Sequence, residues 1–132
     1  MKQSFRTALL TAAALLMLFG AASYSLTVVP DLHGDLVEIG VRPSVLGGTL
    51  LHLYFAAIAM FGFALIVAAA AIQALRGIAP ARIPLGVVAA IYMTFGVMAF
   101  SRSHNPHHLG PLVMGALLAG ALAVPGSDTS RS

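Results

Sequence analysis

The chain contains histidine and carboxylate side chains whose types and spacing could bind a metal ion. Two carboxylates and an imidazole occur together in Asp31-Leu32-His33-Gly34-Asp35, and three more histidines occur within residues 104–108. Imidazole nitrogens and carboxylate oxygens are ligands that zinc and copper ions accept. The pattern therefore predicts a transition-metal site for Zn or Cu. Its candidate ligands are His33, Asp35, His52, His104, His107 and His108.

Other chemistry is open to the same residues. Two histidines from different helices can hold a b-type haem, and His52 with His107 or His108 is one such pair. Aromatic side chains near His52 could line a groove for a quinone, although aromatic packing between helices is routine. Loops also collect polar residues without any metal, and Pro106 disturbs the helical pairing of His104 with His108.

The composition indicates that these residues belong to a membrane protein. Hydrophobic residues make up 59% of the 132 residues and charged residues only 8%, whereas soluble domains carry roughly 25% charged residues. This low share of charged residues excludes a soluble enzyme. The formal net charge of only +3 also excludes a free nucleic-acid-binding domain. The chain has no cysteine, which excludes disulfides, thiolate metal ligands and covalently attached c-type haem.

Charged residues divide the chain into four uncharged segments, and each is long enough to cross a bilayer. A hydrocarbon core of about 30 Å requires roughly 20 helical residues, and a helix satisfies its own backbone groups in lipid. We therefore predict an all-α, polytopic integral membrane protein with a four-helix transmembrane bundle in one domain, residues 1–125. The expected helices are residues 7–29, 44–75, 84–102 and 106–124, followed by a disordered cytoplasmic tail at 126–132.

The first predicted helix has an alternative interpretation as a signal peptide. Lys2 and Arg6 precede an apolar segment and small residues, so cleavage could occur near residues 22–24. The apolar character continues without charge to Val29, however, which is long enough for a full span. We therefore expect this helix to be retained.

The start of the last predicted helix also allows two choices. A helix from Pro111 to Val124 would be only about 21 Å long, which is too short to cross the hydrocarbon unaided. Starting it at Pro106, with Asn105 as the N-cap, restores the length but leaves Pro111 inside the helix. We expect this longer helix, with a kink near Gly110.

The distribution of cations predicts the orientation. With both termini on one side, that side holds five cations and the opposite side holds two. The five are Lys2, Arg6, Arg76, Arg82 and Arg131, and the two are Arg42 and Arg102. The positive-inside rule then places both termini in the cytoplasm. We expect a multi-pass protein of the inner (cytoplasmic) membrane whose histidine-rich segments face the periplasm or exterior. These segments are the loop Pro30–Arg42 and the turn Arg102–Leu109.

The predicted spans contain no acid or base at mid-membrane depth, which argues against an ion carrier. No serine lies in a nucleophile-elbow or triad context, so we expect a role other than catalysis. Small residues spaced four apart, such as Gly115 and Ala119, favour close helix contacts.

We therefore predict an accessory or assembly subunit of a larger membrane complex with a histidine- and carboxylate-rich exterior face. Its partners would be the lipid bilayer and other membrane subunits or a second copy, without nucleic acid. The alternative is a protein that binds Zn, Cu or a small ligand, such as a quinone or haem, at that face.

Overall fold

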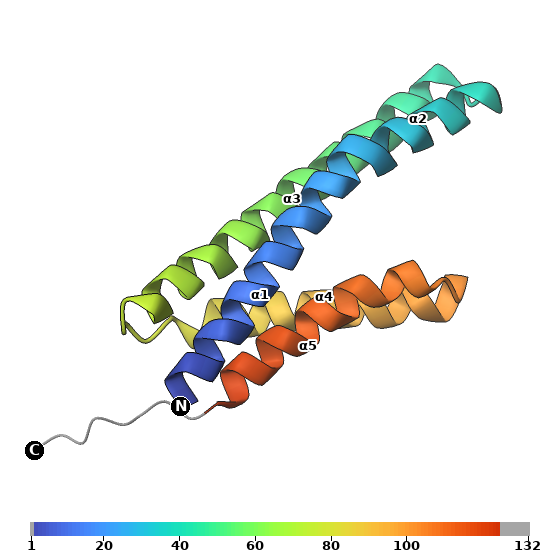
Figure 1. Ribbon diagram of the computed structural model, residues 1–132. Helices are drawn as coiled ribbons and strands as arrows, with labels where there is room; N and C mark the ends of the chain where they lie inside the picture. Colours follow the sequence, from blue (N-terminus) through green and yellow to red (C-terminus); the bar gives the residue numbers. More distant parts are fainter. Residues whose placement is uncertain (1, 125–132) are drawn as a thin grey trace, which may run out of the picture.

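The computed structural model describes residues 2–124, and these residues form helices without any strand (Figure 1). The predicted all-α class is thus confirmed for this part of the chain. The tail predicted at 126–132 lies outside the described residues.

The first helical segment is longer than predicted. Helix α1 (Lys2–Ser23) continues through a π-helical turn (Tyr24–Val28) directly into α2 (Val29–Glu38). The segment predicted as an exterior loop from Pro30 to Arg42 is therefore mostly helical, which corrects that prediction. A proline inside a helix clashes with the carbonyl four residues before it, and the wider π-helical turn directly before Pro30 relieves that crowding.

Helix α3 (Pro43–Leu75) runs back beside α1 and α2 to form a long antiparallel hairpin (Figure 1). Gly40 makes the reversal possible, because its φ of +73° lies in the left-handed region that favours glycine. Pro43 begins α3, where a missing backbone N–H breaks no helical hydrogen bond.

Helices α4 (Arg82–Ser103) and α5 (Leu109–Ala123) form a second, shorter hairpin. The turn between them contains a 3₁₀ helix (Pro106–His108), and the Asn105 side chain caps it by accepting a hydrogen bond of 3.0 Å from the His107 N–H. Asn105 is therefore a cap, as predicted. The helix expected from Pro106 is divided into this 3₁₀ turn and α5, which begins at Leu109. Pro111 therefore lies in the first turn of α5, where its missing N–H is tolerated.

The two hairpins pack together at one end and diverge toward the other (Figure 1). Helix α1 contacts both α3 and α5, and α4 packs mainly on α5. All four helices contribute to one apolar core at the shared end. Its most deeply buried large side chains are Leu10, Met17, Val67, Leu85, Val88 and Leu118.

Two glycines allow close contact between α4 and α5. A Cβ atom added to Gly96 would lie 2.7 Å from the Leu112 backbone nitrogen, and one added to Gly115 would lie 2.9 Å from that of Met93. Of the pair Gly115 and Ala119 expected at a helix contact, Gly115 is buried against α4 and Ala119 is partly buried. Small side chains therefore set the spacing of this hairpin.

Tyr92 of α4 packs in the core in a T-shaped arrangement with Phe63 of α3, at 6.3 Å between ring centroids. Its buried hydroxyl has no hydrogen-bond partner among the described residues. We expect Tyr92→Phe to leave the free energy of unfolding unchanged or to raise it by up to about 1 kcal/mol, because an unsatisfied buried hydroxyl is destabilising. Denaturant titration in detergent measures this, with the exposed Tyr54→Phe as the control. A clear loss of stability in Tyr92→Phe alone would contradict the prediction.

Within residues 2–124, three helical segments are long and apolar enough to cross a membrane. They are Gln3–Glu38, Pro43–Leu75 and Arg82–Ser103. This agrees with a multi-pass membrane protein. Helix α5, with 15 residues, is about 22 Å long and so shorter than a hydrocarbon core of about 30 Å. The fourth crossing and the cytoplasmic location of the termini stay predictions.

Candidate functional site

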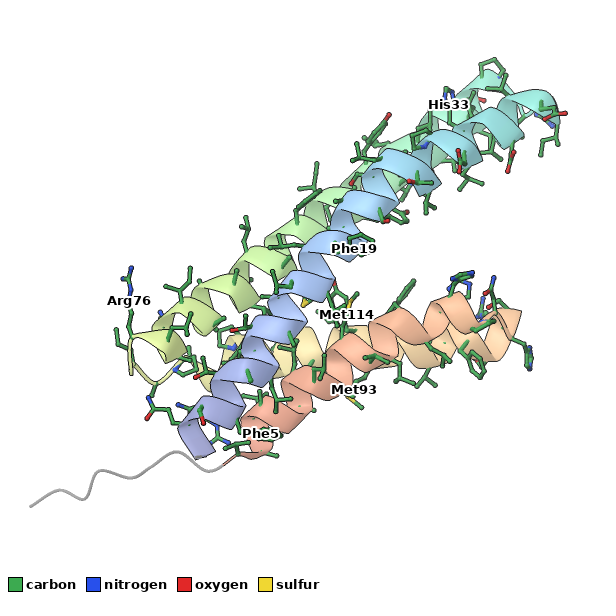
Figure 2. All side chains as sticks on the ribbon, viewed as in Figure 1. Phe5, Phe19, His33, Arg76, Met93 and Met114 are labelled. Atoms are coloured by element: carbon green, nitrogen blue, oxygen red, sulfur yellow. The ribbon has the colours of Figure 1, made fainter. Side chains whose placement is uncertain are left out.

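The predicted metal ligands lie on two different hairpins. His33 and Asp35 belong to α2, near the outer end of the long hairpin, where Figure 2 shows His33. His52 lies in α3, about three turns along that helix. The remaining ligands, His104, His107 and His108, belong to the turn between α4 and α5. Because the hairpins diverge toward these ends (Figure 1), the structure does not bring the six residues into one place.

No group of three or more histidine, cysteine or acidic residues that could hold a metal ion occurs among residues 2–124. Two of the histidines have local structural contacts instead. The His52 Nδ1–H donates to the Gly48 carbonyl oxygen at 2.7 Å, one turn earlier in α3. His104 ends α4 in the left-handed conformation, with a φ of 53°. Binding of zinc, copper, haem or a quinone by these residues stays a prediction from the sequence.

The outer end of the long hairpin, residues 31–46, carries the clearest candidate surface, and we call it the hairpin tip. Its three carboxylates belong to the exposed residues Asp31, Asp35 and Glu38, against one guanidinium from Arg42. The tip also exposes large apolar side chains. They are Val37, Ile39 and Val45, which are 54%, 74% and 55% exposed.

The sequence analysis identified the acids of the tip but missed its apolar side chains. A loop prediction does not assign a direction to the side chains of Val37 and Ile39. In the structure both residues lie at the end of a helical hairpin, where their positions are defined. The helical periodicity of α2 was the available signal, because Leu32 and Leu36, four residues apart, are the partly buried residues of its inner face.

Comparison of the chain with protein-family models, with curated proteins and with solved structures finds no match.

Proposed function

We propose that the protein is a small accessory subunit of a larger membrane complex, and that the hairpin tip docks on another subunit outside the bilayer. The observation that carries this proposal is the combination of exposed apolar and acidic side chains at the end of a hairpin that is longer than the bilayer is thick. The partner surface it fits is apolar with cationic groups around it.

The length of the hairpin supports a tip that stands in water. The segment Gln3–Glu38 has 36 residues and α3 has 33, which correspond to about 54 Å and 50 Å. A bilayer with its headgroups is about 40–45 Å thick. At the average tilt of about 20°, α3 still extends about 47 Å along the membrane normal. The tip therefore reaches beyond the headgroups when Arg76 lies at the opposite interface.

The composition of the tip supports a protein partner there. Lipid does not cover apolar side chains outside the bilayer, and clustered exposed apolar groups in water mark interaction sites. A docking surface combines an apolar centre with a polar rim, and the tip exposes Asp31, Asp35 and Glu38 on the same segment as Val37 and Ile39. Negative charge on the rim selects partners with positive charge. From the cation distribution we expect this tip on the periplasmic or exterior side.

The test is photo-crosslinking in native membranes from a photoreactive amino acid at Ile39 of the full chain. We expect one identified protein to be captured in constant ratio to the subunit. The matched control is the same probe at Leu65, which is 62% exposed in the middle of α3 and should capture lipid. Replacing Asp31, Asp35 and Glu38 together by their amides should lower the yield at Ile39 several-fold, because the rim charges guide association.

Three results would overturn the proposal. Capture of lipid alone at Ile39 would place the tip in the bilayer. Capture of a second copy and no other protein would make the chain a homo-oligomer rather than an accessory subunit. A yield at Ile39 that the triple amide variant does not change would remove the role of the acids.

A further inference from the structure

A small pocket lies at the end of the molecule opposite to the hairpin tip, where α1 begins and α5 ends. Two arginines, Arg6 of α1 and Arg82 of α4, line it together with apolar side chains. The apolar part includes Leu10, Leu85 and Leu122, from three helices. Arg6 is partly buried and Arg82 is exposed, so the pocket lies at the surface of the helix junction, with two cationic groups beside apolar side chains.

Arg6 is partly buried, and its Nε atom is buried without a hydrogen-bond partner among residues 2–124. An N–H donor that is buried without a partner is unfavourable. Three of the four acidic residues of the chain, Asp31, Asp35 and Glu38, lie in α2 at the far end of the long hairpin. The described part of the protein therefore offers Arg6 no anion nearby.

Arg82 is held in place by α5. Its Nη2 donates a hydrogen bond to the Leu122 carbonyl oxygen, which is one of the last carbonyls of that helix and has no partner within it. This contact joins the start of α4 to the end of α5. A guanidinium has five N–H donors, so one bond to a carbonyl leaves donors for an anion beside Arg6.

Both arginines lie where apolar helices begin. Arg82 is the first residue of the span Arg82–Ser103, and Arg6 is in the first turn of the span Gln3–Glu38. When these helices cross a bilayer, their ends lie at the depth of the phospholipid phosphate groups, and the acyl chains run beside the apolar helix faces. Basic pockets between transmembrane helices are known to bind anionic headgroups.

We propose that this pocket, between α1, α4 and α5, binds the phosphate group of an anionic phospholipid through Arg6 and Arg82. The cavity has a volume of about 20 Å³, and a buried water needs about 10–15 Å³. The space therefore admits one phosphate oxygen beside Arg6, while the rest of the headgroup stays at the mouth. The lipid would thereby join three helices at the end where the two hairpins meet.

The test measures lipid binding to the full chain in neutral detergent by native mass spectrometry and calorimetric titration. The probe is dioctanoyl phosphatidylglycerol, and we expect one equivalent to bind. Arg6→Gln and Arg82→Gln should each weaken binding by roughly tenfold or more, the value of a charge-assisted hydrogen bond. Arg6→Lys, which keeps the charge, should recover part of the affinity. Arg76→Gln is the matched control, because Arg76 points away from the bundle at the same end (Figure 2) and should change the affinity less than twofold.

Each of the other results would overturn the proposal. Equal binding of dioctanoyl phosphatidylcholine would show that the headgroup charge is not recognised. Equal binding of inorganic phosphate would assign the pocket to a free anion. The absence of saturable binding would indicate that the pocket holds only water. An equal loss in Arg76→Gln would indicate general surface charge.

Folding of the variants is checked by thermal unfolding without lipid. Arg82→Gln also removes the contact with Leu122 and can destabilise the protein by itself. Arg6→Gln removes a guanidinium whose Nε has no hydrogen bond to the described residues, so this variant remains decisive if Arg82→Gln does not fold.

Discussion

Replacing Gly115 by leucine is expected to destabilise the protein by about 3 kcal/mol, because the added side chain has no space between α5 and α4. A Cβ atom at this position would lie 2.9 Å from the Met93 backbone nitrogen and 3.0 Å from the Ala89 carbonyl oxygen. Both are backbone atoms of a helix, so neither can move without shifting α4 as a whole. We expect the α4–α5 hairpin to separate, and the short helix α5 to lose its position against α1 as well.

The measurement is the free energy of unfolding in mixed micelles by SDS titration. Ala116→Leu is the matched control, since it adds similar bulk at the next residue of α5, where the side chain is exposed. We expect this control to change stability by less than about 0.5 kcal/mol. Equal stability of Gly115→Leu and Ala116→Leu would show that the helices do not approach each other at this glycine.

The second large effect is expected for Leu118→Ala, at about 1–3 kcal/mol. Leu118 of α5 is 0% exposed and lies in the core formed by α1, α3, α4 and α5. Leucine-to-alanine changes in soluble cores cost about 2.7–5 kcal/mol, of which part is the lost transfer of methyl groups out of water. In a bilayer the unpacked helix meets lipid rather than water, so mainly the loss of packing contacts remains.

The control is Leu65→Ala in α3, where the leucine is 62% exposed and exchanges contacts with lipid only. The same SDS titration should separate the two variants by at least about 1 kcal/mol. Indistinguishable unfolding curves would contradict the packing of α5 into the common core.

The stability variants act on the α4–α5 hairpin, which forms part of the arginine pocket and takes no part in the hairpin tip. Gly115 and Leu118 hold α5 in place, and α5 supplies the Leu122 carbonyl that positions Arg82. Loss of α5 packing is therefore expected to weaken the arginine pocket, whereas the hairpin tip is carried by α2 and α3 alone. This difference allows the lipid site and the partner site to be tested separately.

Several features of the fold could be predicted from the sequence. The helices expected at 44–75 and 84–102 compare with Pro43–Leu75 and Arg82–Ser103, within two residues at each end. Such segments are recognisable because length and hydropathy are properties of a continuous stretch of chain. The cap at Asn105 is likewise a local signal, since the side chain bonds to a backbone N–H two residues later.

The continuation of the first helix through Pro30 could not be predicted. Proline is usually a signal for the end of a helix, and only the π-helical turn Tyr24–Val28 makes room for it. The helical structure of this segment matters for the proposed function, because residues 30–38 form one side of the hairpin tip and not a loop. The apolar side chains Val37 and Ile39 then have fixed positions beside the acids.

The sequence by itself determined a nearly uncharged, all-helical membrane protein with its acids and histidines in a few polar segments, because composition and hydropathy are read along the chain. Tertiary structure alone decided that the hairpins diverge, that the candidate metal ligands are divided between them, and that Arg6 and Arg82 share a pocket. The physical reason is that lipid is as apolar as the helices themselves. Contacts between helices therefore depend on which small residues of distant segments meet, and this chain has alanine and glycine on many helix faces.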